Sequence, residues 1–423
     1  MSGDFEQAKS RVCQSEGAYV SVRPLASSWE QRKLGEVAHR VIRKNEGNQS
    51  DLPLTISAQH GLVDQRDYFN NQVASRDMSG YYLLENGEFA YNKSTSGDSP
   101  WGAIKRLTKY EKGCLSTLYI CFGLDLGDPD FLVTYYETNR WHGAVQMIAA
   151  EGARNHGLLN IAPDDFFETV LTLPCSTEEQ KQIGCFFTQL NSLITLHQRK
   201  YDKLCTVKKS MLDKMFPKPG ETEPEIRFEG FTDPWEQRKL NEYLETSREK
   251  NESCHFGKDD VLSVSGDYGI VNQIEFQGRS YAGTSVANYG VVHKGDVVYT
   301  KSPLRINPYG IIKTNRGNDG IVSTLYAVYH PTEKTHPDFV QVYFEQNARM
   351  NNYMTPLVSK GAKNDMKVSA ENALKGAVTF PGIKEQEVIA SYFSQLDDLI
   401  TLHQRKLELL RNIKKSLLDR MFV

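Results

Sequence analysis

The residue types that most often carry chemistry are present, but their spacing matches no catalytic or metal-binding motif. The cysteines are odd in number and form no C-x-x-C pair, which argues against a disulfide framework and against a zinc knuckle. We therefore expect reduced, mostly buried thiols. The cysteines stand at positions 13, 114, 121, 175, 185, 205 and 254.

Motifs for phosphate, nucleotide or acyl chemistry are also missing. The sequence holds no G-x-x-x-x-G-K-[ST] loop, no G-x-G-x-x-G loop and no G-x-S-x-G elbow. Asn307-Pro308-Tyr309 is similar to the Asn-Pro-Pro-aromatic motif of amino-methyltransferases, but the second proline and an upstream cofactor loop are lacking, which predicts a turn. We expect no catalytic residue, no metal site and no cofactor bound by this chain. A nuclease with a degenerate motif is an alternative.

Composition indicates an ordinary globular protein. The chain has 423 residues, of which 39% are hydrophobic and 24% charged, with a net charge of -3, which argues against disorder. No apolar run is long enough for a membrane span or a signal peptide, so we expect a cytoplasmic protein. The near-neutral balance does not by itself indicate nucleic-acid binding.

The sequence is a tandem repeat of about 206 residues. The hexapeptide W-E-Q-R-K-L at 29–34 recurs at 235–240, and L-I-T-L-H-Q-R-K at 193–200 recurs letter for letter at 399–406. Between these anchors the copies keep their spacing but differ in most side chains. Two copies of one scaffold therefore present two different surfaces, which suits a protein that recognises two different targets.

Each copy combines a mixed domain with one long helix. Short runs rich in Val, Ile, Tyr and Phe between glycine-bearing turns predict a twisted sheet, with a short helix at 131–138 and at 339–346. The predicted class is α+β. The predicted segments are an N-terminal extension of uncertain role at 1–28, domain 1 at 29–175, a helix at 176–216, a linker at 217–234, domain 2 at 235–382 and a helix at 383–423.

Both long helices carry an apolar stripe with alternating steps of three and four residues, as in the seam of a coiled coil. Each helix would have about 39 residues and a length of roughly 58 Å. The predicted seam consists of Phe187, Leu190, Ile194, His197, Tyr201, Leu204, Met211 and Met215 in the first helix and Phe393, Leu396, Ile400, His403, Leu407, Leu410, Leu417 and Met421 in the second.

The simplest partner for each stripe is the other helix. We expect an antiparallel coiled coil with pseudo-two-fold symmetry that separates the two domains; the alternative is that each helix packs on its own domain. No further metal ligands accompany His197 and His403, so these histidines are expected in the core or the seam.

The repeated motifs resemble the specificity subunit of type I restriction–modification systems. The resemblance spans residues 29–423 and is carried by W-E-Q-R-K-L before each domain and by E-Q-x-x-I…F-x-Q-L-x-x-L-I-T-L-H-Q-R-K…K-K-S-(M/L)-L-D-(K/R)-M-F at 179–216 and 385–422. Residues 1–28 differ from the family-like approach to Trp235.

The resemblance implies a non-catalytic subunit whose two target-recognition domains each read one half of a bipartite, asymmetric DNA site. It implies that the helices set the gap between the halves. It also implies two modification methyltransferase subunits and two motor-nuclease subunits as partners, with S-adenosylmethionine, ATP and magnesium bound there and not on this chain.

Given this resemblance, residues that contact DNA are expected on loops that differ between the copies, because Arg, Lys and Asn present donors for guanine and adenine edges. One loop follows Tyr-x-Lys-Ser and the other follows a shared glycine. The candidates are Lys93, Ser94, Thr95, Ser96, Trp101, Arg154, Asn155 and His156 in domain 1 and Lys301, Ser302, Arg305, Asn307, Lys360, Lys363, Asn364 and Lys367 in domain 2.

Charge is unevenly distributed along the chain. Residues 177–218 hold eight Lys and Arg against four Asp and Glu, whereas 384–423 hold seven against six, so the remainder of the chain is acidic. We expect weak binding of DNA by the chain alone. A non-catalytic scaffold whose two domains bind protein ligands is the alternative function, and periodicity alone does not exclude it.

Overall fold

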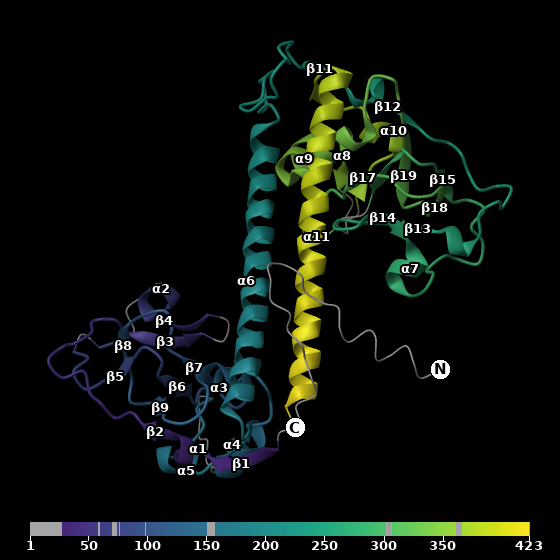
Figure 1. Cartoon of the computed structure of the whole chain (residues 1–423). Helices are drawn as coiled ribbons and strands as arrows, with labels where there is room; N and C mark the ends of the chain where they lie inside the picture. The colour runs from purple at the N-terminus through teal and green to yellow at the C-terminus, as the bar shows by residue number, and fades with distance from the viewer. Residues whose placement is uncertain are drawn as a thin grey trace. The chain divides into compact units, whose positions relative to one another are not determined.

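The computed structural model describes residues 28–57, 60–69, 74–75, 77–97, 99–149, 157–301, 304, 307–360 and 366–422. The chain divides into two compact units (Figure 1). Unit 1 contains the chain up to Leu196 and from Leu407 onward, and unit 2 spans His197–Lys406. The boundaries fall inside the two long helices, α6 (Thr177–Lys214) and α11 (Ile383–Met421), which are both continuous.

Unit 1 is built on an antiparallel sheet with strand order β2-β9-β6-β7. Its strands are β2 (Ala38–Arg40), β9 (Ile120–Leu124), β6 (Phe89–Asn92) and β7 (Ala103–Arg106). The remaining strands form the pairs β1 (Trp29–Lys33) with β10 (Val170–Pro174), β3 (Leu54–Ser57) with β4 (Gly61–Asp64), and β5 (Tyr82–Glu85) with β8 (Lys112–Leu115). Short helices complete the domain: α1 (Leu34–Val37), α2 (Gln65–Phe69), α3 (Pro129–Tyr136), α4 (His142–Ile148) and α5 (Pro163–Phe167).

Unit 2 repeats this plan with strand order β12-β19-β16-β17. The strands are β12 (Leu244–Thr246), β19 (Tyr326–Pro331), β16 (Val297–Thr300) and β17 (Ile312–Thr314). The pairs are β11 (Glu236–Lys239) with β22 (Ala377–Phe380), β13 (Leu262–Ser265) with β14 (Gly269–Asn272), β15 (Gly290–Val292) with β18 (Gly320–Val322), and β20 (Ser359–Lys360) with β21 (Met366–Lys367). The helices are α7 (Gln273–Gln277), α8 (Pro337–Glu345), α9 (Asn347–Met354) and α10 (Ala370–Ala373), with 3-10 turns η2 (Leu240–Glu242) and η3 (Lys258–Asp260).

The two copies share a sterically required glycine after the central strand. Gly102 has φ +81° and a Cβ there would lie 2.2 Å from the carbonyl oxygen of Asn92. Gly310 has φ +78° and a Cβ there would lie 2.0 Å from the carbonyl oxygen of Thr300. Only glycine fits a left-handed position with the backbone so close, so the same turn leads into β7 and β17.

The long helices pair antiparallel within each unit. In unit 1 the start of α6 and the end of α11 both pack on the domain core, which takes in Phe187, Leu190 and Leu417. In unit 2 the end of α6 and the start of α11 do the same, and His197 Nδ1 lies 2.8 Å from His403 Nδ1. The helices therefore contact each other and a domain at once, and neither helix packs on its own domain alone.

An aromatic cluster fastens the end of each long helix to the domain of the other copy. Phe422, which ends the second copy, lies 5.8 Å from Trp29 and 5.6 Å from Phe131 between ring centroids. Phe216, which ends the first copy, lies 5.9 Å from Trp235 and 5.8 Å from Phe339. Most of the surface buried in these clusters is aromatic and apolar, which is the main source of stability in such contacts.

The predicted seam residues differ in burial. Six of them are buried and ten are half-buried, and many of the half-buried ones, such as Leu204, Met211 and Leu417, pack against a domain core as well. The buried ones are Phe187, Leu190, Met215, Phe393, Leu396 and Leu407, and the half-buried ones are Ile194, His197, Tyr201, Leu204, Met211, Ile400, His403, Leu410, Leu417 and Met421.

The expectation of mostly buried thiols is wrong. Of the six cysteines in the described ranges, Cys114 and Cys121 are buried, whereas Cys175, Cys185 and Cys254 are exposed. Cys185 lies on the outward face of α6, and Cys254 occupies a turn with φ 52°, so neither position faces a core. Among the helices of the described chain, none is long and apolar enough to cross a membrane.

Candidate nucleic-acid interface

In unit 1 the candidate loop after β6 is hydrogen-bonded to residues 157–159. The backbone N–H and the Oγ1 of Thr95 both donate to the carbonyl of Gly157, at 2.5 and 3.0 Å, and Ser94 forms a bridge with Leu158. The N–H of Leu159 donates to the carbonyl of Lys93 at 2.9 Å. The loop after β6 is therefore joined by backbone hydrogen bonds to the segment that follows the shared glycine.

The other candidates of unit 1 differ in what they can offer a ligand. Ser94 and Ser96 are polar residues of the loop, with Ser96 pairing with Ser99 through backbone hydrogen bonds. Trp101 is half-buried against the domain core, which leaves only part of its ring available. Arg154, Asn155 and His156 lie outside the described residues.

In unit 2 the structure places Lys301 and Asn307 on the equivalent loop. The N–H of Lys301 donates to the carbonyl of Leu325 at 3.1 Å, and the carbonyl of Asn307 accepts from Gly310 at 3.0 Å. Ser302, Arg305, Lys363 and Asn364 lie outside the described residues. Lys360 and Lys367 belong to the β20–β21 hairpin, which follows Thr355; the Oγ1 of Thr355 lies 3.2 Å from the hydroxyl of Tyr309, next to the loop.

A half-buried lysine stands at the base of each loop. Burial lowers the pKa of Lys93, whose Nζ donates to the carbonyl of Ile161 at 3.2 Å. Burial also lowers the pKa of Lys301, and the positive charge of Lys250 lowers it further. Lys93 and Lys301 are equivalent in the repeat, so this lysine is a common feature beneath two different loop tips.

Sequence reasoning missed two basic residues beside Lys301. A pocket of about 260 Å³ in unit 2 is lined by Arg248, Lys250 and Lys301, with Ser323, Thr324 and Glu371 among the other residues. Such donors suit phosphate oxygens and base edges. The run S-R-E-K after β12 was the available signal, but its position next to the loop depends on the pairing of β12 with β19.

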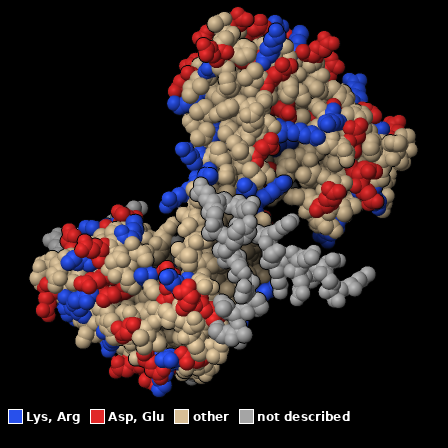
Figure 2. Space-filling model, viewed as in Figure 1, with Lys and Arg blue, Asp and Glu red and all other residues tan. Residues whose placement is uncertain are grey.

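Charge of both signs is interspersed over each unit. In the view of Figure 2, blue Lys and Arg alternate with red Asp and Glu, and neither unit shows a single broad basic face on this side. Many cations are also paired, for example Arg43 with Glu88 at 2.9 Å and Arg316 with Asp338 at 2.9 Å. On the face shown, interspersed charges of both signs produce little long-range attraction for a polyanion.

Apolar side chains are exposed on the repeated octapeptide of the helices. Leu193 and Leu196 are 46% exposed in unit 1, and Leu399 and Leu402 are 44% exposed in unit 2. These are the same two positions in the two copies. Within the described part of the chain, no group of three or more His, Cys, Asp or Glu side chains is arranged to hold a metal ion.

Comparison with known proteins gives structural neighbours only. No family model and no curated protein matches. The HsdS subunit of Thermoanaerobacter tengcongensis is 15% identical with a TM-score of 0.40, covering 95% of this chain and 98% of that one. The S subunit of a type I restriction-modification system from M. genitalium is 13% identical with a TM-score of 0.49, covering 95% and 97%.

A third neighbour comes from work on complex assembly and conformational transition of the type I R-M system; it is 14% identical with a TM-score of 0.42 and covers 94% of this chain and 98% of that one. The neighbours' titles thus name the family that the sequence motifs resemble. Because identities and TM-scores are this low, we base the function on the residues and contacts of this chain.

Proposed function

We propose that this chain is the DNA-recognition subunit of a type I restriction–modification complex. Each recognition domain reads one half of a bipartite, asymmetric DNA site, and the paired helices fix the gap between the halves. The chain carries no catalytic group; two methyltransferase subunits and two motor-nuclease subunits dock on it and bring S-adenosylmethionine, ATP and magnesium.

This proposal rests mainly on one observation: the two copies share their scaffold but differ in the residues at the loop tips. Strand order, the glycine turn and the lysine below the loop are shared, whereas the loop tips differ: Thr95 and Ser96 in unit 1 correspond in position to 303 and 304 in unit 2. A shared scaffold with different tips suits two different half-sites on one kind of polymer.

The helices support the gap-setting role because they are continuous and fastened at both ends. α6 has 38 residues and α11 has 39, and each joins the two units without a break. A helix is stiff compared with a flexible linker, so the separation of the domains is a property of the helix length.

The exposed leucines support docking of two identical partners. Two leucines are exposed at equivalent positions of both helices, so the same apolar surface occurs twice. They are Leu193 and Leu196 in α6 and Leu399 and Leu402 in α11. Lys200 and Lys406 follow each pair, are exposed, and form no ion pair within the described residues. Because the octapeptide is identical in the two copies although the domains diverged, both surfaces suit the same partner.

A domain replacement tests the proposal. The full chain is co-expressed with a type I methyltransferase subunit, and host DNA is sequenced for modified adenines. We expect one bipartite site with two different halves. Replacing residues 235–382 by a second copy of 29–175 makes both recognition domains alike, so the modified site is expected to become palindromic with an unchanged or closely similar gap.

The matched control exchanges only the linker, by substituting glycine and serine for residues 219–224, and should leave the site unchanged. A protein-binding scaffold would give no modified adenines that depend on the chain. Modification that keeps the original asymmetric site after the domain replacement would also contradict the proposal.

A further inference from the structure

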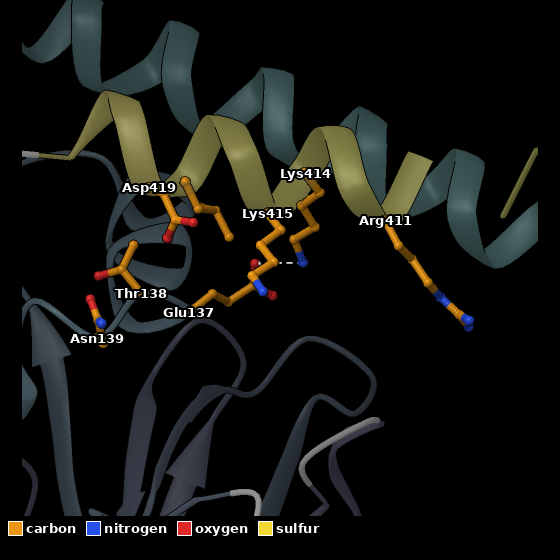
Figure 3. Close-up of a pocket in the computed structure, with 8 residues that line it drawn as sticks. Glu137, Thr138, Asn139, Arg411, Lys414, Lys415 and Asp419 are labelled. Carbon is orange, nitrogen blue, oxygen red and sulfur yellow. Dashed lines mark ion pairs between the residues drawn. The ribbon is translucent and has the colours of Figure 1, made fainter. Parts of the chain in front are cut away.

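One helix of each domain is fastened to a long helix at two points. The first point is aromatic, Phe131 of α3 against Phe422 and Phe339 of α8 against Phe216. The second point is ionic and lies where α3 and α8 end. Lys414 Nζ is 2.8 Å from Glu137 Oε2 in unit 1 (Figure 3), and Lys208 Nζ is 2.6 Å from Glu345 Oε1 in unit 2.

The surroundings of the two ion pairs are duplicated. In unit 1 the pair lines a pocket of about 310 Å³ with Thr138, Asn139, Arg411, Lys415, Leu418 and Asp419. All eight counterparts, at 205, 208, 209, 212, 213 and 345–347, line a larger pocket of about 930 Å³ in unit 2. The Glu, Asn, both Lys, the Leu and the Asp are identical, so this junction changed little while the loop tips diverged.

A second lysine approaches each glutamate from the sheet. Lys105 on β7 and Lys313 on β17 are equivalent, and burial lowers the pKa of both, while Glu137 and Glu345 respectively counter this effect. Lys313 is only 8% exposed, and Glu345 Oε2 is buried without a hydrogen bond from the described residues. The glutamate thus pairs with a cation of the long helix and also interacts electrostatically with a cation of the sheet.

Two separate attachment points fix an angle, whereas one point leaves a domain free to pivot. Phe131 and Glu137 are six residues apart, which is about 9 Å along a helix. Phe339 and Glu345 have the same separation. The apolar core also holds each domain on the long helices, and near the ionic point Arg140 Nη2 donates to the carbonyl of Asp419 at 3.3 Å in unit 1, as Arg349 Nη2 does to the carbonyl of Leu212 at 3.2 Å in unit 2. The ion pair adds a restraint at the end of α3 or α8 that lies away from the aromatic cluster, and its loss permits small rotations that displace the distant loop tips.

We propose that the duplicated lysine–glutamate pair sets the angle of each recognition domain on the long helices and thereby determines how strictly the protein selects the gap length. The inference rests on the proposed function. Lys414, Glu137, Lys208 and Glu345 are positioning residues: they act through the domain and touch no base.

The two pairs differ in strength. Lys208 also reaches Asp397 Oδ1 at 2.6 Å, whereas Asn191 occupies the corresponding position in unit 1. Lys208 is also the less exposed lysine, at 14% against 21% for Lys414. A less exposed cation shared by two carboxylates makes the stronger attachment, so loss of Lys208 has the larger effect.

The test measures modification of plasmids whose gap is the native length or one base pair longer or shorter, in complexes of the full chain with its methyltransferase subunit. We expect Lys414→Met to modify the native gap at nearly the wild-type rate but to lose discrimination on the order of tenfold, or about 1.4 kcal/mol. Lys208→Met should lose more. The charge exchange Lys414→Glu with Glu137→Lys should restore discrimination only in part, because the cation introduced at position 137 also faces Lys105 of β7.

The matched control is Lys415→Met, which removes a lysine from the same pocket that forms no ion pair in the described part of the chain, and it should discriminate like wild type. The inference is overturned if Lys414→Met and Lys208→Met both discriminate between gap lengths as wild type does. It is also overturned if Lys415→Met loses as much discrimination as they do. Unfolding of Lys414→Met, judged by circular dichroism, also overturns it, because the pair would then be required for folding and not for the angle. If the wild-type chain directs no modification of a bipartite site, the proposed function itself has failed.

Discussion

Lengthening both helices by one heptad tests the gap-setting role directly. The histidine pair His197–His403 marks a level at which the helices touch. Repeating residues 190–196 before His197 and residues 396–402 before His403 adds seven residues to each helix with matching seam positions. The added length is about 10.5 Å, which corresponds to about three base pairs at 3.4 Å each.

The twist of DNA sets the cost of this change. Seven residues rotate an α-helix by about 20° less than two full turns, whereas three base pairs rotate DNA by roughly 100°, given about 10.5 base pairs per turn. The preferred gap should therefore lengthen by about three base pairs, with slower modification than wild type because the DNA must untwist to fit both domains.

The assay compares modification of a plasmid set whose gaps differ by single base pairs. An insertion in α6 alone is the control; it leaves the seams out of register and should abolish modification at every gap. A double insertion that folds, modifies DNA and still prefers the original gap would refute the reasoning.

Three further predictions concern stability. Phe216→Ala and Phe422→Ala each empty a buried aromatic site and should lower the free energy of unfolding by ~3–5 kcal/mol, measured by urea denaturation; losses under 1 kcal/mol would contradict the clusters. Gly184→Ala places a Cβ 2.5 Å from the backbone nitrogen of Phe131 and should cost about 1–3 kcal/mol, seen as a lower melting temperature. Burial lowers the pKa of His197, and the charge of the facing His403 lowers it further. The unfolded chain then binds the proton more readily, so stability should fall as the pH drops through about 6.5, and His197→Gln should weaken that dependence in urea midpoints measured across this range.

Much of the fold follows from patterns in the sequence. The α+β class and the two long helices are confirmed, and the predicted 176–216 segment corresponds to α6 at Thr177–Lys214. Apolar residues at alternating steps of three and four predict a helix reliably here, because a helix seam repeats this spacing over many turns. A glycine such as Gly184 normally weakens a helix; here α3 passes too close for a side chain.

The reciprocal attachment of the helix ends could not be predicted. Phe216 and Phe422 continue the apolar stripe, and periodicity alone does not distinguish a partner helix from a domain core. Only the three-dimensional path brings Phe422 to Trp29, which lies at the far end of the chain. The spacing of residues within a short stretch of sequence does not predict contacts between distant parts of the chain.

The sequence predicted where part of the candidate interface lies, but not all of the residues that form it. The turn after Tyr-x-Lys-Ser led to Lys93 and Lys301, which do stand at the base of the loops. Arg248 was missed because its run lies more than 50 residues earlier in the sequence and reaches Lys301 only through the strand order of the sheet. Whether the candidate loop residues contact bases stays a prediction.

The route of the chain through its units also dictates an order of events during synthesis. Unit 2 is one uninterrupted segment, His197–Lys406, whereas unit 1 needs the segment from Leu407 onward to complete its core around Phe422. The half of the protein that leaves the ribosome first is therefore the half that is finished last. A chain released after Lys406 would hold every residue of the second unit but an unsealed first one, with Trp29 and Phe131 lacking Phe422 as a partner.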